Sequence, residues 1–347
     1  MAKFVVEVLP LTDVEPHPNA DRLDLAVVGN YRVIVQKDAY RPNDLVAYIP
    51  EGAVLPDALI DEVGIRPYLA GSRHDRVMAT KLRGVLSQGL VVRARSHWQA
   101  GQDVTDELGV TKWEPEIPAG MAGNPAPAPI WWRSYDVEPY NRYPHLLADG
   151  EPVYVTEKIH GTCAMIGAFE GERFVSSKGL SDRHLVLKPD ENNLYWRAAL
   201  KYDVHRRIEE RWGSSHQVLV YAEVYGAQFP NGSKIQDLAY NAGLGLRLAI
   251  FDVRLDGEFL AYTEALDAAR AMELPFVPML YEGPFERERV LALASGRESV
   301  SGTQAHIREG IVIRPQTPRD DEELGRVVLK YVSGEYLTRK GERTEYT

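Results

Sequence analysis

At 347 residues the chain is longer than a typical single domain, so two domains are expected. Its 44% hydrophobic and 26% charged residues are those of an ordinary globular protein. The net charge of −10 argues against a protein that binds nucleic acid purely through charge, because such binding depends on neutralising phosphates. Cys163 is the only cysteine, which excludes an internal disulfide and a zinc site built from cysteines. We expect a cytoplasmic location and no membrane partner, because no apolar stretch is long enough to span a bilayer.

The first 113 residues are predicted to be mostly β-structure. Short runs rich in β-branched and aromatic residues occupy 31–36, 45–50 and 90–93, and turn-forming residues separate them. Short strands at this spacing indicate a small barrel or sandwich. Residues 17–23 (His-Pro-Asn-Ala-Asp-Arg-Leu) resemble the opening of OB-type tRNA-binding domains. This match favours an OB-like β-barrel and is too short to indicate tRNA.

A basic stretch lies within this region. Between residues 66 and 95 there are seven lysines and arginines against one acidic residue, Asp75. Such a stretch is either a solvated face or a patch that follows a phosphate backbone, as OB barrels often provide. The sequence leaves both interpretations open. The candidate nucleic-acid-binding residues are Arg76, Lys81 and Arg83.

Residues 114–130 are rich in proline, glycine and alanine, and they are expected to form an extended linker without helix. The region from 131 to 347 alternates predicted strands and helices. Because strands outnumber helices and many are joined as hairpins, the fold class is α+β, with antiparallel sheets flanked by helices. Residues 320–323 are expected at a hairpin tip. Strands are predicted at 152–156, 163–169, 173–177, 217–224, 246–254, 310–314 and 326–332, and helices at 191–212, 262–272 and 285–295.

The first candidate catalytic motif is the stretch Glu157-Lys-Ile-His-Gly-Thr162. An apolar run ends at a lone lysine, Lys158, and Gly161 follows three residues later. An amine at a strand end can meet a bound phosphate, but the short pattern alone fits a surface lysine equally well.

Further charged residues lie in or beside apolar strands. Taken singly, each of them fits an ordinary strand-end position. Taken together, two carboxylates and three lysines indicate function, because burying charge is costly unless it is paired or used. Besides Lys158, these residues are Lys178 in Ser-Ser-Lys-Gly, Glu223 in Tyr-Ala-Glu-Val-Tyr-Gly, Glu309 in Glu-Gly-Ile-Val-Ile-Arg-Pro, and Lys330 in Val-Val-Leu-Lys.

The order of these motifs resembles the covalent nucleotidyltransferases, which comprise ATP-dependent nucleic-acid ligases and mRNA capping enzymes. The match covers roughly residues 135–340, and residues 157–162 are similar to the RNA ligase branch. An OB-like domain ahead of the core resembles the Deinococcus-type RNA ligase. Only 17 residues follow Lys330, which leaves no room for the C-terminal OB domain of DNA ligases and capping enzymes. The expected organisation is an OB-like domain at 1–113, a linker at 114–130 and an adenylyltransferase domain at 131–347.

The resemblance implies an ATP-dependent RNA ligase that uses Mg²⁺ or Mn²⁺ and joins 5′-phosphate to 3′-OH ends. Lys158 would attack the α-phosphorus of ATP to form lysyl-AMP, which requires a depressed lysine pKa. Lys178, Lys330 and the metal would help to depress it, and Lys330 would also contact the α-phosphate. Glu223 and Glu309 would hold the metal. AMP would then pass to the RNA 5′-phosphate, and the 3′-OH would displace it.

Further residues are implied in binding. Phe251 resembles the adenine-stacking position, although a core aromatic fits it equally well. The 5′-phosphate would be held by Lys178 and Arg183. The remaining residues implied in the nucleotide pocket are Glu157, Ile159, His160, Gly161 and Thr162.

Three departures from the family pattern stand out. Lys178 replaces a frequent arginine, Cys163 stands where RNA ligases often have asparagine, and Tyr331-Val332 lacks the second lysine of the usual K-x-K pair. A capping-type GTP-dependent guanylyltransferase and a non-catalytic RNA-binding protein remain as alternatives. The partner is expected to be RNA or an RNA-containing duplex, and the protein is expected to be monomeric.

Overall fold

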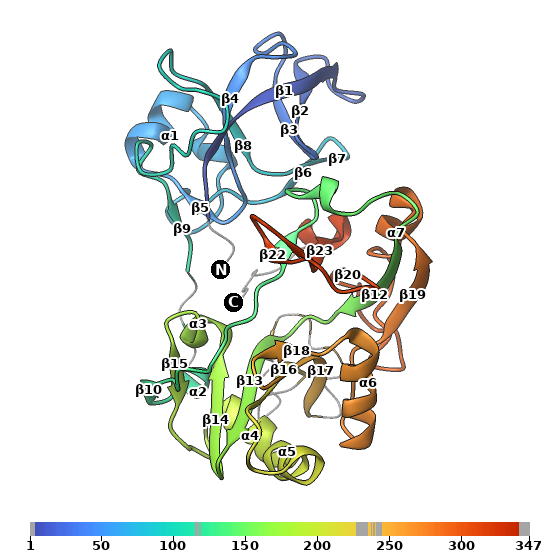
Figure 1. The fold of residues 1–347 in the computed structure, drawn as a ribbon. Coiled ribbons are helices and arrows are strands. Elements are labelled where there is room, and N and C mark those ends of the chain that lie inside the picture. Colours follow the sequence, from blue (N-terminus) through green and yellow to red (C-terminus); the bar gives the residue numbers. More distant parts are fainter. Residues whose placement is uncertain are drawn as a thin grey trace.

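The computed structural model describes residues 4–114, 117, 119–226, 235, 236, 238, 240 and 245–339. Within them, no helix has the length and apolar character needed to cross a membrane. The chain folds into an N-terminal β domain that lies above a larger domain of two sheets (Figure 1).

The N-terminal domain is built on one curled antiparallel sheet with the order β3-β2-β1-β4-β8. The long strand β1 pairs with β4 through its first half and with β2 through its second half, with a register shift between Leu11 and Asp13. Such a shift bends a strand and lets the sheet curl. The strands are β1 (Glu7–Pro16), β2 (Leu23–Val28), β3 (Tyr31–Gln36), β4 (Leu45–Ile49) and β8 (Leu90–Arg93). The predicted strands at 31–36, 45–50 and 90–93 are therefore confirmed.

Smaller elements complete this domain. The His17–Leu23 stretch forms the β1–β2 connection, where the His17 ring contacts the Leu82 carbonyl and the Asn19 amide donates to the Arg83 carbonyl at 2.9 Å. In this chain the motif therefore anchors the β6–β7 hairpin. The elements are β5 (Ala53–Val54), β6 (Thr80–Leu82), β7 (Val85–Ser87), β9 (Thr111–Lys112), α1 (Asp57–Val63) and the 3-10 turn Arg66–Tyr68.

The expected linker is partly built into the second domain. Residues 119–122 form the short helix α2 (Ala119–Ala122), and β10 (Pro125–Pro127) pairs with β15 (Leu185–Leu187). The prediction of an extended segment without helix was wrong here. The four residues of α2 contain no proline, and β10 is an edge strand, where proline is tolerated. The boundaries at 113/114 and 130/131 remain a proposal.

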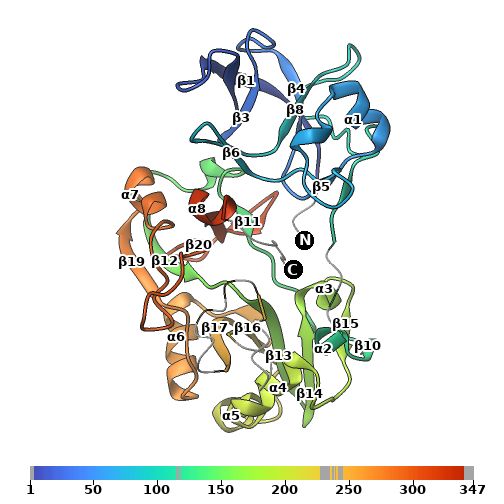
Figure 2. The same cartoon turned by 180° about the vertical axis from the view of Figure 1, so that it is seen from behind.

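The larger domain consists of two five-stranded sheets, and Figures 1 and 2 show both below the N-terminal domain. The first, here the inner sheet, has the order β14-β13-β16-β17-β18, and the second, the outer sheet, has the order β11-β23-β20-β12-β19. All pairings are antiparallel except β11 with β23, which is parallel. The inner strands are β13 (Thr162–Phe169), β14 (Glu172–Ser177), β16 (Val218–Gly226), β17 (Leu246–Leu255) and β18 (Glu258–Phe259). The outer strands are β11 (Glu138–Pro139), β12 (Pro152–Lys158), β19 (Met279–Pro284), β20 (Gly310–Pro315) and β23 (Leu329–Val332).

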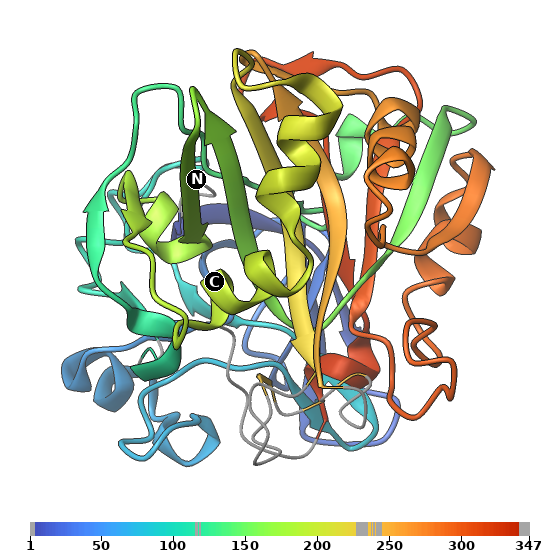
Figure 3. The same ribbon diagram turned by 90° about the horizontal axis from the view of Figure 1, so that it is seen from below.

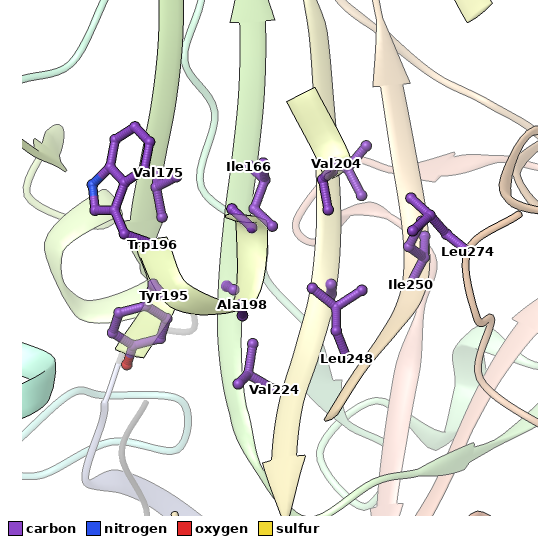
Figure 4. Packing of buried hydrophobic residues seen from close by; sticks show 14 of the residues in the cluster. Ile166, Val175, Tyr195, Trp196, Ala198, Val204, Val224, Leu248, Ile250 and Leu274 are labelled. Atoms are coloured by element: carbon purple, nitrogen blue, oxygen red, sulfur yellow. The ribbon is translucent and has the colours of Figure 1, made fainter. Parts of the chain in front are cut away.

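Helices cover one face of the inner sheet. Ile166, Val220 and Ile250 on the strands pack against helix residues such as Trp196 and Val204 in one buried cluster, part of which Figure 4 shows. Seen from below in Figure 3, the yellow-green helices lie across these strands. Trp132 and Tyr135 cover part of the opposite face, where they pack against Met165, Leu219 and Tyr221, and other residues of the sheet line the pocket described below. The helices of this domain are α3 (Lys178–Ser181), α4 (Leu194–Lys201), α5 (Val204–Trp212), α6 (Tyr262–Ala271), α7 (Arg287–Ala292) and α8 (Gly334–Leu337), with a 3-10 turn at Pro144–Leu146.

The fold class is confirmed, and the differences lie at element ends. The helix expected at 191–212 is two helices, because Asp203 takes a left-handed backbone conformation with a φ of 49°. The strand expected at 326–332 divides into β22 (Gly325–Arg326) and β23, and the helix expected at 285–295 is shorter. Strand β19 was not predicted. The hairpin at the acidic stretch is confirmed, with β21 (Asp320–Asp321) paired with β22.

Candidate active site

Lys158 is the last residue of β12, where it lies opposite Gly310 of β20. Its side chain is 27% exposed and forms an ion pair with Glu309. The neighbouring Glu157 is fully buried and accepts hydrogen bonds from the Ser299 backbone N–H, at 3.0 Å, and from the Ser299 hydroxyl. The strand therefore sends Glu157 into structural contacts and leaves Lys158 at the open end.

Gly161 allows the chain after Lys158 to approach β16 closely. A Cβ at this position would lie 2.4 Å from the Val224 carbonyl oxygen and 3.0 Å from a Glu223 carboxylate oxygen. Any larger residue would push Lys158 and Glu223 apart. The spacing of the K-x-x-G pattern thus has a steric reason in this fold.

The two predicted carboxylates are buried in the same region, and their pKa values are shifted in opposite directions. Burial raises the pKa of Glu223 to about 8, although Lys158 and the Gly161 backbone N–H oppose the shift. Burial would also raise the pKa of Glu309, but the Lys158 ammonium and His160 outweigh it and lower that pKa to about 2. One carboxylate is therefore ionised and paired, whereas the other lacks enough positive charge around it.

His160 and Tyr336 support Glu309 from the side away from Lys158. The His160 Nδ1 lies 3.3 Å from a Glu309 carboxylate oxygen and 2.7 Å from the Tyr336 hydroxyl. The Glu309 backbone N–H donates to the Tyr240 hydroxyl at 2.9 Å. Sequence reasoning missed both tyrosines, because an isolated aromatic residue outside the motifs carries no signal of its own.

Two further contacts fix the turn after Lys158. The Gln236 amide donates to the Gly161 carbonyl, and the hydroxyls of Thr162 and Tyr195 are hydrogen-bonded, both at 2.9 Å. Thr162 is buried and starts β13, so it orients the strand. Gln236 and Tyr195 were also missed by sequence reasoning.

Lys330 lies on the same face of the outer sheet as Lys158. It pairs with Val312 of β20, which in turn pairs with Thr156 of β12, so the two lysines stand two residues apart along the strands. Side chains at such positions point to the same side of a sheet. Both lysines line one cavity.

Phe251 occupies a β-bulge. Tyr221 pairs with Asp252 and Ala222 pairs with Ile250, so Phe251 is the extra residue of β17. A bulge re-aims a side chain, and Phe251 lines the cavity beside Val277. The prediction at Phe251 thus coincides with an aromatic wall of the pocket, and its role as the adenine contact stays a prediction.

Asp252 joins the two sheets behind Phe251. Its buried carboxylate accepts hydrogen bonds from the Tyr135 hydroxyl at 2.7 Å, from Arg326 at 2.6 Å and from Arg314 at 3.3 Å. The arginines belong to the outer-sheet region, whereas Asp252 belongs to the inner sheet. Arg314 belongs to the Glu-Gly-Ile-Val-Ile-Arg-Pro motif, but the sequence did not indicate that Asp252 is its partner.

The cavity that these residues surround has a volume of about 400 Å³. It lies between the inner and outer sheets and also reaches residues of the N-terminal domain. Among the residues implied in nucleotide binding, the lining includes Glu157, Lys158, Ile159, His160, Gly161, Glu223, Phe251, Glu309 and Lys330.

Lys178 reaches the cavity from the start of α3, but its ammonium is held by acidic groups. It donates to Asp136 at 2.8 Å and to Asp182 at 3.2 Å, and despite burial these partners raise its pKa. Arg183 is exposed at the end of the same turn. In this state Lys178 is engaged with carboxylates, so a 5′-phosphate would have to compete with them.

The three candidate residues of the N-terminal basic stretch lie in different environments. The Arg76 guanidinium stacks 3.9 Å above the Trp113 ring, and burial lowers its pKa. Lys81 and Arg83 are exposed on the β6–β7 hairpin. Only the hairpin pair is therefore available to a phosphate backbone, and Arg76 has a packing role.

The site offers oxygen ligands to a divalent cation, although it does not form a complete metal cage. Within the described residues, no group of three or more His, Cys, Asp or Glu side chains forms a metal site. Glu223 and Glu309 supply only carboxylate oxygens, which suits Mg²⁺ or Mn²⁺ when phosphates and water complete the coordination. The raised pKa of Glu223 fits this, because a cation beside it would keep the carboxylate ionised.

Two antiparallel sheets around a strand-end lysine, preceded by a curled β domain, define a nucleotidyltransferase-like protein with an OB fold. The family model described as RNA ligase matches residues 151–332, which is 182 of the 347 residues. The chain therefore belongs to the RNA ligase family. A second model, an OB-fold domain, matches residues 5–94.

Solved structures give the same fold. A mutant of the Naegleria gruberi RNA ligase with AMP and Mn superposes with a TM-score of 0.80 at 20% identity, covering 96% of this chain and 98% of that one. The Naegleria gruberi RNA ligase with PPi gives 0.79 at 21% identity, covering 97% and 98%. Another mutant, with ATP and Mn, gives 0.79 at 19% identity, covering 96% and 98%. No curated protein sequence matches the chain.

Proposed function

We propose that this protein is an ATP-dependent RNA ligase that joins 5′-phosphate and 3′-OH ends through lysyl-AMP and RNA-adenylate intermediates. The observation that carries the proposal is Lys158 at the end of β12, ion-paired with Glu309 in a cavity that Glu223, Phe251 and Lys330 also line. Membership of the RNA ligase family and the ATP and AMP complexes of the Naegleria gruberi enzyme support it.

The first step transfers AMP to the protein. Lys158 loses a proton, its Nζ attacks the α-phosphorus of ATP, and pyrophosphate leaves as the phosphoramidate forms. Lys330 on the neighbouring strand neutralises charge on the α-phosphate. Phe251 and Val277 provide an apolar wall for the adenine. Glu223 and Glu309 would hold a divalent cation, which neutralises phosphate charge when it is bound.

The later steps use the RNA ends. An oxygen of the RNA 5′-phosphate attacks the phosphorus of lysyl-AMP, and the lysine nitrogen leaves and regains its proton. The 3′-OH of the second end then attacks the 5′-phosphorus, and AMP leaves as the phosphodiester forms. The fixed positions of the site residues on strand ends favour the alignment that such in-line displacements require.

The direct test is incubation with α-labelled ATP and Mg²⁺ or Mn²⁺. The wild-type chain should become covalently labelled, and Lys158→Ala and Lys158→Arg should abolish the label. Lys188→Ala, a change at an exposed lysine in the same domain, serves as the matched control and should keep it. An unlabelled wild-type chain contradicts the proposal, and preferential labelling by GTP would point to a guanylyltransferase.

We further propose the Deinococcus-type arrangement and repair of nicked duplex or broken structured RNA as the physiological role. The OB fold ahead of the core supports this, because such folds bind strands along one face. Sealing assays with RNA and DNA exchanged strand by strand test the substrate. Activity only on single strands would contradict the nick-repair part.

A further inference from the structure

Lys158 and Lys178 reach the cavity from different sheets. Lys158 ends β12 of the outer sheet, and the turn after it leads to Thr162, the first residue of β13. Lys178 follows β14 of the inner sheet as the first residue of α3. The pairing of β13 with β14 ends at Ala164 opposite Ser177. The ladder between these strands therefore does not reach Thr162 or Lys178.

The Tyr195 side chain spans this gap. Its hydroxyl is hydrogen-bonded to the Thr162 hydroxyl at 2.9 Å and also to the Ser177 side chain. Ser177 caps α3, because its hydroxyl accepts from the Leu180 backbone N–H at 3.4 Å. One phenol oxygen thus joins the residue that starts β13 to the residue that precedes Lys178.

The Tyr195 hydroxyl is enclosed by protein. The residue is 2% exposed, and burial raises the pKa of its phenol, which stays neutral. Figure 4 shows its ring in the buried cluster, with the oxygen pointing away from Val175 and Trp196. Burying a hydroxyl is costly unless it is hydrogen-bonded, so these contacts hold it in one place. Tyr195 does not line the cavity, so it can act only through residues that do.

The start of α4, which carries Tyr195, is fixed by the segment expected to be a linker. The Asn193 side-chain carbonyl accepts from the backbone N–H groups of Tyr195 at 3.0 Å and Trp196 at 3.4 Å. The Asn193 amide donates to the Met121 carbonyl of α2 at 3.3 Å. A Cβ on Gly123 would lie 2.9 Å from the amide nitrogen of Asn193, so the chain after α2 lies against this capping residue. Tyr195 therefore projects from a helix end with a defined position.

The second step of the proposed reaction needs both turns at once. An oxygen of the RNA 5′-phosphate attacks the phosphorus that Lys158 carries, the phosphorus–nitrogen bond breaks, and the nitrogen regains a proton. Lys178 is the cation expected to hold the attacking phosphate. A displacement of about 1 Å between reacting groups costs on the order of 100-fold in rate. The first step depends mainly on Lys158 and Lys330, which the outer sheet holds together.

We propose that the Tyr195 hydroxyl is a positioning group for transfer of AMP from Lys158 to the RNA 5′-phosphate. By bonding Thr162 and Ser177 together, it sets the separation between the turn after Lys158 and the turn that begins at Lys178. This inference rests on the proposed function and adds to it a residue that lies outside the motifs.

The test measures the two steps separately. Labelling of the protein by α-labelled ATP gives the rate of the first step. The purified lysyl-AMP form, mixed without ATP with a nicked RNA duplex that carries a 5′-phosphate, gives the second step in a single turnover. Tyr195→Phe keeps the ring and removes only the hydroxyl. It should leave the first step within about twofold and slow the second by about 10- to 100-fold at saturating duplex, with an unchanged half-saturating duplex concentration.

Substitutions at Thr162 test the same hydrogen bond from its other side. Thr162→Val removes the hydroxyl and should slow the second step, whereas Thr162→Ser keeps the hydroxyl and should retain most of the rate. Tyr195→Phe combined with Thr162→Val should be little slower than Tyr195→Phe alone, because both changes remove one shared bond. Tyr202→Phe, at the partly exposed C-cap of α4, is the matched control and should keep both rates.

The outcomes separate this inference from the proposed function. An unchanged second step in Tyr195→Phe overturns the role of Tyr195, and so does an equal loss in both steps, which a general structural defect would produce. Absence of labelling in the wild-type chain overturns the proposed function instead. Labelling of each variant shows that it is folded. If Tyr195→Phe does not label, the second-step rates of Thr162→Ser and Thr162→Val decide the question, and equal rates overturn the inference.

Discussion

At the scale of single residues, the site places two carboxylates of opposite protonation behaviour around one lysine. Glu309 is ionised through its contacts with Lys158 and His160, with a pKa of about 2. Glu223 is buried with a pKa raised to about 8, so it is protonated at neutral pH in the ligand-free protein. Neighbouring titratable groups whose pKa values are shifted in opposite directions are typical of catalytic sites.

The raised pKa of Glu223 predicts a stability change with pH. In the unfolded chain its pKa is 4.5, so between about pH 4.5 and 8 the unfolded state loses the proton that the folded state keeps. Stability therefore falls as pH rises through this window, by at most about 1.4 kcal/mol per pH unit. Glu223→Gln removes the proton uptake, so in EDTA its Tm should exceed that of the wild type at pH 8 and approach it near pH 5. Thermal unfolding at the two pH values measures this, with exposed Glu191→Gln as control. A constant difference at both pH values would contradict it.

At the scale of elements, the site depends on strands that lie so close together that only a glycine fits between them. Gly310, opposite Lys158 in β20, would place a Cβ 2.2 Å from the Tyr331 carbonyl oxygen of β23. The β20–β23 pairing is also what sets Lys330 on the same face as Lys158. The glycine after Glu309 therefore controls the spacing of both lysines.

We predict that Gly310→Ala forces β20 and β23 apart. Because the neighbour is backbone, the strands must shift, and a loss of about 1–3 kcal/mol in unfolding free energy is expected, as for other overpacked sites. Gly334→Ala is the matched control, since its nearest neighbour is the flexible end of Leu86 at 3.2 Å. Urea unfolding compares the two variants. Equal stability of both would show that the β20–β23 spacing is not limiting.

The sequence predicted the elements better than their connections. Lys158, Glu223, Glu309 and Lys330 were found because each stands at the end of, or within, an apolar strand, and the structure brings them to one cavity. The partners Tyr336 and Tyr240 were missed, because they approach only through tertiary packing. The division of the helix at 191–212 was missed, because Asp203 takes a left-handed conformation that the local sequence does not indicate. The structure of the linker was missed, because β10 forms only through its pairing with the distant strand β15.

At the scale of the whole molecule, a buried charge cluster ties the two sheets together. Asp252 of β17 bonds Arg314 of β20 and Arg326 of β22, and it receives the Tyr135 hydroxyl. The cavity lies between the sheets, so the cluster also sets its width. Asp252 is fully buried, which means its arginine partners share one desolvated carboxylate.

Asp252→Asn should destabilise the protein strongly. The substitution leaves two arginines without their negative partner, and breaking a buried pair costs about 3–5 kcal/mol. Asp256→Asn, which breaks an exposed contact with His216, should cost no more than about 1 kcal/mol. Denaturant unfolding with linear extrapolation gives both values. Near-equal losses would show that the cluster does not hold the sheets together.

The exposed hairpin of the N-terminal domain should contribute to RNA binding through charge. Lys81→Gln with Arg83→Gln is expected to weaken binding of a nicked RNA duplex and to flatten its salt dependence, by about 0.9 in log–log slope for each phosphate that is no longer neutralised. The pair Lys37→Gln with Arg41→Gln, exposed in the same domain, is the control. Arg76→Ala should lower stability instead, because Arg76 packs on Trp113. Unchanged slopes would identify the hairpin as an ordinary solvated surface.

The ion pair between Lys158 and Glu309 has a consequence for chemical selectivity. A protonated amine has no lone pair, so activated acyl compounds that diffuse into the cavity meet an inert side chain. In the proposed mechanism the amine becomes reactive when Glu309 moves to another positive partner, such as the divalent cation, and the ammonium loses its proton. We therefore expect Lys158 of the ligand-free protein to resist modification by such compounds, and we expect substrate binding to make it reactive.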